Sequence, residues 1–276
     1  MEDKELIKRL ENNMQMALTS EICDQHEDLK KEIHLMNIDG EMKCPLCERD
    51  RLNAESEQIE TVKLINALNR QEYNVFAHKS ELKDEGLLEV SFGTYEALTE
   101  EETTNKQRAT EAYQKFQQGE RFNVWLTGSP GVGKSHLAMS ILRNLNERGN
   151  KDKSCLYISV DEMLLKIRDS FNNKESKYTE HYFVDLLSNV DYLVLDDLGA
   201  ETGGTGTVKK ATDFTLRVLY SIGNARQNKS TIITTNLSRI ALEGMYDQKL
   251  VSRLMKDTYL INFKITSDKR IKNIEF

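Results

Sequence analysis

The 276-residue sequence lacks several features that would place it in a specialised class. It has only two prolines and one tryptophan, no internal repeat, and no proline-rich or serine-rich linker. No run comes near the roughly 18 consecutive apolar residues that a membrane-spanning helix needs. Residues 1–5 do not begin the apolar stretch of a secretory signal. We therefore expect a cytoplasmic protein without a membrane partner.

A strong positive charge is also absent. The chain has 38 Lys and Arg against 45 Asp and Glu, a net charge of −7. This balance excludes a generally basic coat for nucleic acid, so any DNA contact must come from a local patch or a pore built by several subunits. A hydrophobic content of 38% with 30% charged residues is typical of a soluble globular protein, and the length suits two domains.

Three regions differ in their pattern. Residues 1–50 combine an apolar-periodic helix over residues 6–18 with a segment of cysteine and histidine. Residues 51–87 have apolar residues near helical spacing and predict a helical connector. Its apolar stripe either packs within its own domain or binds a partner. In residues 88–276 strands alternate with helices, which predicts a parallel sheet with helices on both faces.

Five runs in the last region are expected to be strands. The first four are near-continuously apolar or β-branched, as in strands that are buried on both faces. The fold class is therefore α/β with a five-stranded parallel sheet. The five runs are residues 122–127, 155–160, 192–195, 230–235 and 259–265.

A glycine-rich turn follows the first expected strand. The run Gly128-Ser-Pro-Gly-Val-Gly-Lys134-Ser135 matches G-x-x-x-x-G-K-[ST]. Glycines let backbone N–H groups turn inward around phosphate oxygens, and the following helix adds its positive end. We expect Lys134 to bridge the β- and γ-phosphates of ATP and Ser135 to ligate Mg²⁺. The strand before the motif and the amphipathic helix after it disfavour a chance turn. The predicted nucleotide-binding residues are Gly128, Ser129, Pro130, Gly131, Val132, Gly133, Lys134, Ser135, His136 and Asp196.

Polar residues end the third and fourth expected strands. Asp196 is the predicted metal partner, and Asp197 is predicted to polarise the attacking water. Two surface turn residues are the alternative interpretation. Asn236 lies at the strand edge where open parallel sheets bind ligands. It is predicted to orient that water, although asparagine is also a common helix cap.

Three of the four cysteines lie in the first fifty residues. In a cytosolic protein such crowding suggests a metal before a disulfide. Cys23-x₂-His26 and Cys44-x₂-Cys47 form two chelating pairs, and the chain between them can return as a hairpin. They predict a closed tetrahedral Cys₃His zinc site that supplies folding energy. His34 is an alternative ligand to His26, and three incidental thiols are the simpler interpretation.

Taken in order, the motifs resemble those of the AAA+ ATPases, and within them the DnaC/DnaI-type helicase loaders and their relative IstB. The likeness spans residues 88–270 and includes Ser91-Phe92…Tyr95 and Ser252-Arg253-Leu254. It implies a fold without a C-terminal helical lid. It also implies that Arg253 is an arginine finger for a neighbouring subunit, and hence a ring or helical oligomer; a surface salt bridge is the alternative. Arg270 takes the place of a basic residue near the nucleotide.

The same resemblance implies a contact with single-stranded DNA. It falls on a helical segment with basic residues near an aromatic ring, which suits phosphates that need countercharge and bases that stack. An ordinary solvated helix face is the alternative. In a second loop of the family only Lys209 and Lys210 are plausible contacts. The predicted DNA-binding residues are Lys166, Arg168, Phe171 and Lys174.

The function implied by the resemblance is an ATP-dependent loader that places a replicative DNA helicase on single-stranded DNA. Loaders of the DnaI type carry an N-terminal zinc region that engages the helicase. An IstB-like transposition helper would use the same core on duplex DNA with a transposase. A DnaA-like initiator is disfavoured because no helix-turn-helix region follows residue 265. A P-loop small-molecule kinase would need no arginine finger, and a DNA-binding module that does not hydrolyse ATP is a further alternative.

Overall fold

The structure is a computed structural model, and it describes residues 18–26, 32–38, 40–148, 151–202 and 210–270. The chain forms two compact units, residues 1–67 and 68–276, and their boundary falls inside the 35-residue helix α2 (Pro45–Lys79). The helix predicted over residues 6–18 lies outside the described residues except for Leu18, which begins a strand. None of the described helices is both long and apolar enough to cross a membrane.

The first unit contains a small antiparallel sheet. Its elements are β1 (Leu18–Ile22), the single turn η1 (Asp24–His26), β2 (His34–Ile38) and β3 (Glu41–Lys43). The strand order is β1-β2-β3, so the predicted hairpin between the two chelating pairs is confirmed. Gly40 has a φ of 87° between β2 and β3, a conformation that favours glycine. Its N–H donates to Asn37 Oδ1 at 2.9 Å.

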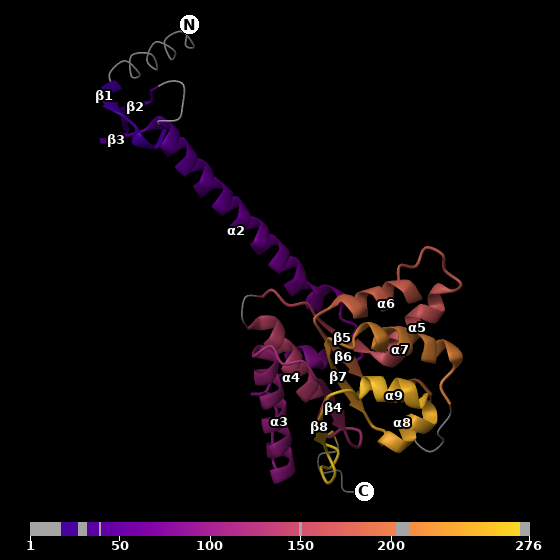
Figure 1. Cartoon of the computed structure of the whole chain (residues 1–276). Coiled ribbons are helices and arrows are strands. Elements are labelled where there is room, and N and C mark those ends of the chain that lie inside the picture. Colours follow the sequence, from indigo (N-terminus) through magenta and orange to yellow (C-terminus); the bar gives the residue numbers. More distant parts are fainter. Residues whose placement is uncertain (1–17, 27–31, 39, 149–150, 203–209, 271–276) are drawn as a thin grey trace. The chain divides into compact units, whose positions relative to one another are not determined.

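Helix α2 begins at Pro45, a residue suited to the first helical position. No residue of α2 is buried, and the helix is continuous across the boundary between the units (Figure 1). About half of each apolar side chain in its predicted stripe is exposed, and a partner-binding role for the stripe stays a prediction. These side chains are Leu52, Ile59, Val62, Ile65 and Leu68.

The second unit is built on a parallel sheet. Its strands are β4 (Asn123–Thr127), β5 (Cys155–Ser159), β6 (Tyr192–Asp196), β7 (Ser230–Thr235) and β8 (Thr258–Asn262). They lie in the order β5-β6-β7-β4-β8, and all neighbours are parallel. The predicted five-stranded parallel sheet is confirmed, although β8 ends at Asn262 and not at residue 265.

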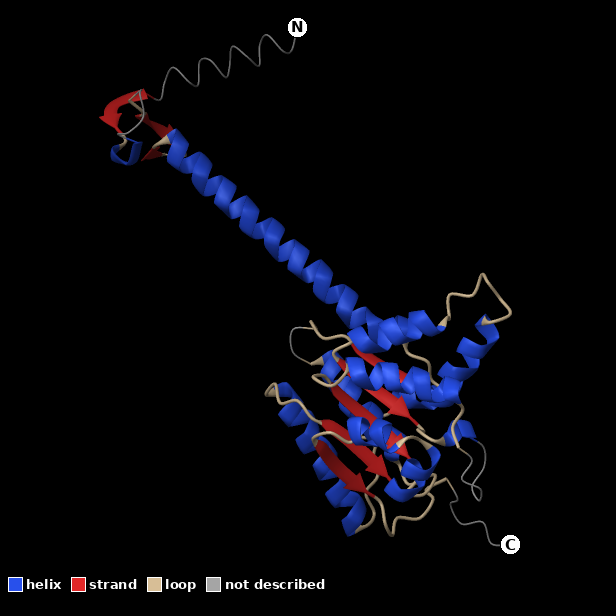
Figure 2. Cartoon of the chain, turned by 45° about the vertical axis from the view of Figure 1, so that its right-hand side comes forward, coloured by secondary structure: helices blue, strands red, loops and turns tan. Residues whose placement is uncertain are grey.

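Helices cover both faces of this sheet (Figure 2). They are α3 (Glu100–Gln117), α4 (Lys134–Glu147), α5 (Val160–Ser170), α6 (Glu180–Asn189), α7 (Asp213–Ala225), α8 (Arg239–Met245) and α9 (Gln248–Leu254), with short turns η2 (Glu85–Glu89) and η3 (Ala200–Thr202).

Two hydrophobic cores form because neighbouring strand residues point to opposite faces. Trp125 and Ile233 belong to the core that α5 to α9 cover, whereas Val124 and Ile232 belong to the core under α3 and α4. The described residues after β8, 263–270, form no helix.

The segment that follows α2 extends the sheet beside β5. The N–H of Glu81 donates to the carbonyl of Tyr157 at 2.9 Å, and the N–H of Ser159 donates to the carbonyl of Glu81 at 3.1 Å. Glu81 pairs with Ile158 in a parallel bridge. The sheet unit therefore includes residues that the sequence assigned to the 51–87 connector. The functional division at residues 50 and 87 stays a prediction.

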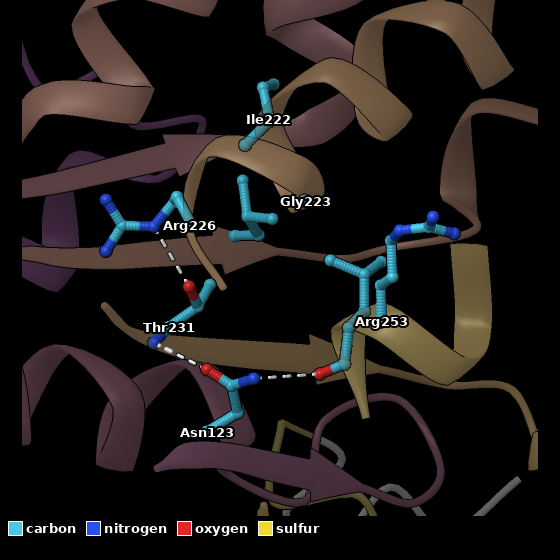
Figure 3. A pocket seen from close by; sticks show the side chains of 8 residues that line it. Asn123, Ile222, Gly223, Arg226, Thr231 and Arg253 are labelled. Atoms are coloured by element: carbon cyan, nitrogen blue, oxygen red, sulfur yellow. Dashed lines mark hydrogen bonds between the residues drawn. The ribbon is translucent and has the colours of Figure 1, made fainter. Parts of the chain in front are cut away.

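A buried arginine joins the end of α6 to the sheet. Arg226 is 4% exposed, and its guanidinium donates to five oxygens. Two of them, the carbonyls of Leu187 and Val190, lie at the carboxyl end of α6, where a helix leaves acceptors unpaired and a cation is favoured. Figure 3 shows Arg226 donating to Thr231 Oγ1, beside a cavity of about 10 Å³. Burial lowers the pKa of Arg226 to about 9.

Replacing Arg226 with Met should destabilise the second unit by about 3–5 kcal/mol, because several buried acceptors lose their donor. Urea unfolding measures the change. Arg217 lies on the same helix but is 61% exposed and paired with Glu180, so Arg217→Met should cost no more than about 1 kcal/mol. Equal losses in the two variants would contradict the role assigned to Arg226.

Candidate functional site

The main cleft of the second unit lies at the carboxyl edge of the sheet, where open parallel sheets bind ligands. Its volume is about 1200 Å³. The residues predicted from three separate motifs meet there, because β4, β6 and β7 are neighbours that end at the same edge. They are Lys134, Ser135, Asp196, Asp197 and Asn236.

The glycine-rich loop connects β4 to α4. Gly128 has a φ of 146°, and a Cβ there would lie 2.7 Å from the backbone oxygen of Phe263. Gly133 has a φ of 99° and would place a Cβ 2.7 Å from the ring of Tyr95. Gly133 caps α4 without a side-chain hydrogen bond, so the N–H groups of the first helical turn remain suited to an anion. The loop has the geometry of a phosphate cradle.

The ammonium group of Lys134 lies at the centre of the site. It donates to the carbonyls of Gly128 and Ser129 at 2.9 and 2.7 Å, and to Asn236 Oδ1 at 2.7 Å. Burial lowers the pKa of Lys134 to about 8, against the opposing effect of the two aspartates. A buried cation held in this way suits a polyanionic ligand, whose charge would favour the protonated form.

The carboxylate of Asp196 joins three elements. Its Oδ1 accepts from Ser135 Oγ of α4 at 2.8 Å and from Thr234 Oγ1 of β7 at 2.7 Å. Burial raises the pKa of Asp196. The donor set of one hydroxyl and one carboxylate provides the hard oxygen ligands that Mg²⁺ prefers. These residues therefore fit a magnesium site next to the phosphate cradle.

Thr234 is a residue of the site that the sequence analysis missed. Besides donating to Asp196, its hydroxyl accepts from the N–H of Asp197 at 2.9 Å. Asp197 has a φ of 56°, a left-handed conformation that costs energy in a non-glycine residue. The bond from Thr234 holds this turn, and Asn236 Nδ2 donates to Asp197 Oδ1 at 3.4 Å. The two threonines that end β7, Thr234 and Thr235, come just before Asn236 and could have indicated a hydroxyl group at the site.

The segment predicted to open the ATPase domain packs against the glycine-rich loop. The ring of Tyr95 meets His136 edge-on, with centroids 5.2 Å apart, and His136 Nε2 lies 2.9 Å from the carbonyl of Ser91. Burial lowers the pKa of His136. His136 therefore holds the segment before the sheet in place. It also lines the cleft itself.

Residues after β8 close one side of the cleft. The N–H of Lys269 donates to the carbonyl of Gly131 at 3.0 Å, and Lys269 pairs with Glu102 of α3 at 3.2 Å. Arg270 is exposed, lines the cleft and pairs with Asp268 at 3.2 Å. Arg270, the basic residue expected near the nucleotide, is thus at the cleft and lies next to Asp268.

Arg253 lies on α9 and is absent from the described residues that line the cleft. Its guanidinium carbon is 4.4 Å from the centre of the Tyr220 ring, and Nη1 donates to the carbonyl of Lys249 at 3.3 Å. Its buried Nε has no hydrogen-bond partner within the described part of the chain. In Figure 3 the Arg253 side chain extends away from Arg226 and Asn123. Neither of these contacts is the salt bridge offered as the alternative.

The predicted DNA-binding residues fall into two groups on α5 and the turn after it. Lys166 pairs with Glu81 and lies over the ring of Tyr178. Arg168 and Phe171 instead share Phe214: the guanidinium carbon of Arg168 is 5.7 Å from its ring centre, and the Phe171 ring is edge-on at 5.5 Å.

Exposure separates the candidates further. Phe171 is 60% exposed, so its ring is not part of the core. Lys174 and Lys210 are exposed as well, and Lys209 lies outside the described residues. Arg168 and Phe171 form the pair with both charge and an accessible ring.

Four potential metal ligands meet in the first unit. Cys23, His26, Cys44 and Cys47 place their ligand atoms within 4.8 Å of one another. The Cys23 and Cys47 sulfurs are 3.8 Å apart, and His26 Nδ1 lies 3.3 to 3.7 Å from the three sulfurs. Tetrahedral zinc with ordinary bond lengths requires about 3.8 Å between sulfurs and about 3.6 Å between sulfur and nitrogen. The cluster fits zinc, with His26 and not His34 beside the thiols.

The strand, glycine-rich loop and helix, with acidic and amide residues at the ends of neighbouring parallel strands, define a P-loop nucleotide-binding domain of the AAA+ type. A model of the IstB-like ATP binding protein family matches residues 80–266. The chain therefore belongs to the IstB-like ATP-binding family.

Individual relatives agree with this assignment. The replicative helicase loader DnaC of Escherichia coli strain K12 is 35% identical over 112 residues, which span 41% of this chain and 43% of that protein. The match thus covers less than half of the relative. The crystal structure of the DnaC helicase loader superposes with a TM-score of 0.54 and 24% identity, over 66% of this chain and 100% of the other. The crystal structure of DnaI superposes with a TM-score of 0.53 and 22% identity, over 66% of this chain and 95% of the other. These two likenesses show the shared fold.

Purified protein should contain about one Zn²⁺ per chain, since three thiolates and one imidazole complete a tetrahedral site. Cys44→Ser should lose the metal and unfold the first unit, while nucleotide binding by the second unit persists. Elemental analysis and circular dichroism measure the two effects. Cys155→Ala, which changes the cysteine outside the cluster, should keep the metal. A metal-free, folded first unit would refute the site.

Proposed function

We propose that this protein is a Mg²⁺-dependent ATPase that loads a replicative DNA helicase onto single-stranded DNA. The observation that carries the ATPase part is the convergence of Lys134, Ser135, Asp196, Asp197 and Asn236 on one cleft. The loader part is supported by the similarity to the DnaC helicase loader and by the Cys/His cluster of the first unit.

In the proposed reaction the chain positions water and phosphate. Lys134 and the loop N–H groups hold the β- and γ-phosphates, and Ser135 and Asp196 hold the metal ion. Bound Mg²⁺ would offset charge on the phosphate oxygens. Asp197 polarises the water. Asn236 contacts both Asp197 and Lys134, and it thereby holds the group that polarises water and the group that binds phosphate in a fixed relative position.

The first unit is proposed to engage the helicase. The zinc cluster fixes a small sheet that could not bury a sufficient core alone, and the half-exposed apolar stripe of α2 offers a partner surface. On the second unit, Arg168 and Phe171 are proposed to contact DNA. A transposition helper of the IstB kind is the alternative, because the family match covers the shared ATPase core.

Changing Lys134 to Ala should abolish ATP binding, because the phosphates lose their buried cation. Asp197→Asn should retain binding but lower the hydrolysis rate about 100-fold or more, because an amide cannot accept the proton. Calorimetry and phosphate release measure the two steps. Asp185→Asn, an exposed change on α6 outside the cleft, is the control. Unchanged turnover by Asp197→Asn would disprove the role of Asp197.

Arg253 is proposed to complete the site of a neighbouring subunit, since it lies outside its own cleft and carries an unpaired donor. Such a head-to-tail contact builds a ring or an open helix. Arg253→Ala and Lys134→Ala proteins, each inactive alone, should recover part of the ATPase activity on mixing. Arg239→Ala, which removes an exposed arginine paired within α8, should stay active. Near-normal turnover by Arg253→Ala alone would exclude an arginine finger.

The loader function is tested with the replicative helicase of the source organism and circular single-stranded DNA. The protein should raise the amount of helicase bound to the circle when ATP is present. Lys134→Ala and Phe171→Ala should reduce that amount. If the protein leaves helicase loading unchanged but retains a transposase on duplex DNA, the transposition helper is the correct function.

A further inference from the structure

A lysine that no motif contains lies at the edge of the nucleotide cleft. Lys83 follows the segment that pairs with β5, and it lines the cleft together with Lys134 and Asp197. Glu81 pairs with Ile158 of β5 in parallel. Two residues further along the same direction, Lys83 therefore lies at the carboxyl edge of the sheet, where the cleft opens.

The register of the sheet places Lys83 on the side of the acidic residues. Ser159, the last residue of β5, pairs with Asp196 of β6, so a single strand separates the Lys83 segment from β6. Adjacent strands are about 4.8 Å apart, which leaves about 10 Å between the segment and β6. From this position the ammonium group of Lys83 reaches Asp161, two residues after the end of β5.

Lys83 now pairs with Asp161, and it can leave this carboxylate for another anion. Its ammonium group lies 2.7 Å from Asp161 Oδ2 in the first turn of α5, and the two side chains are 61% and 24% exposed. Asp161 also accepts a bond from Ser159 Oγ, and its Oδ1 accepts from the N–H of Glu162. Both of these bonds go to Oδ1 and persist without the lysine, and Oδ2 can turn to water because Asp161 is partly exposed. Pairs near the surface contribute little to stability, so the lysine can leave at small cost.

The acidic residues around Lys83 keep its side chain protonated. The hydrogen bond and charge of Asp161, with smaller contributions from Glu162 and Asp197, raise the pKa of Lys83. Lys83 is thus a permanent cation within the influence of Asp197, the residue proposed to polarise water at the terminal phosphate. Lys134, the lysine of the glycine-rich loop, already donates to two carbonyls of that loop.

We propose that Lys83 is a second phosphate-binding cation, which leaves Asp161 to contact the terminal phosphate of a bound nucleoside triphosphate. This role rests on the proposed ATP binding and adds a cation from the segment before the P-loop. A nucleoside diphosphate lacks the phosphate that Lys83 would reach. Lys83 then distinguishes the triphosphate from the diphosphate, and Asp161 competes with the triphosphate for it.

Calorimetric titration of the full chain with Mg²⁺ and either the non-hydrolysable analogue AMP-PNP or ADP tests the role. Lys83→Gln should weaken AMP-PNP about tenfold, the effect of one charge-assisted hydrogen bond, and leave ADP within about twofold. Lys83→Arg should restore most of the difference. Lys79→Gln, an exposed lysine at the end of α2 that does not line the cleft, should bind both as the wild type does.

A second variant separates contact with phosphate from a structural effect. Asp161→Asn should tighten AMP-PNP binding when Lys83 is present and should have no effect in the Lys83→Gln background. An equal effect in both backgrounds, or an unchanged preference for AMP-PNP over ADP in Lys83→Gln, overturns the role of Lys83. If Lys83→Gln weakens both nucleotides equally, the residue is structural and the proposal fails. A wild-type chain that binds neither nucleotide would overturn the proposed ATPase function itself.

Discussion

The buried carboxylate of Asp196 is the constraint around which the second unit is arranged. It accepts hydrogen bonds from Ser135 on α4 and Thr234 on β7 while it ends β6, so the P-loop helix and two strands share one oxygen. Burial disfavours its charge and raises its pKa, and a bound cation would reverse that cost. Without ligand and metal, the negative charge of Asp196 is therefore only partly stabilised. Ionisable groups with shifted pKa values of this kind are common in active sites.

Motifs that are contiguous in sequence were predictable, because their chemistry is local. The phosphate loop needs glycine at set positions, and an acidic pair after an apolar strand marks the metal side. The first four strands were found for a similar reason, since strands buried on both faces consist of uninterrupted apolar or β-branched residues. The error at the end of β8 came from apolar residues beyond Asn262: Ile265 is 80% exposed there, and Glu101 accepts the N–H groups that a longer strand would have paired.

Contacts that depend on register were not predictable from one sequence. Thr234 acts because β7 lies beside β6, and Arg226 acts because the end of α6 comes within reach of α7. Neither adjacency follows from local pattern. The histidine of the metal cluster is an intermediate case: spacing allowed His26 or His34, and only the placement of β2 directs His34 away from the thiols. The spacing of cysteines and histidines in the sequence limits which residues can be ligands, and the fold determines which of them lie together.

The segment after α2 links elements that the sequence had separated. The sequence analysis placed a boundary at residue 87, yet Glu81 exchanges two backbone hydrogen bonds with Tyr157 and Ser159 of β5. The family match also begins at residue 80. Two ion pairs, Glu81 with Lys166 and Lys83 with Asp161, join this segment to α5, the helix that also carries Arg168. The same segment borders the nucleotide cleft at Lys83 and continues covalently into the end of α2, so it connects the cleft, α5 and the last turn of α2.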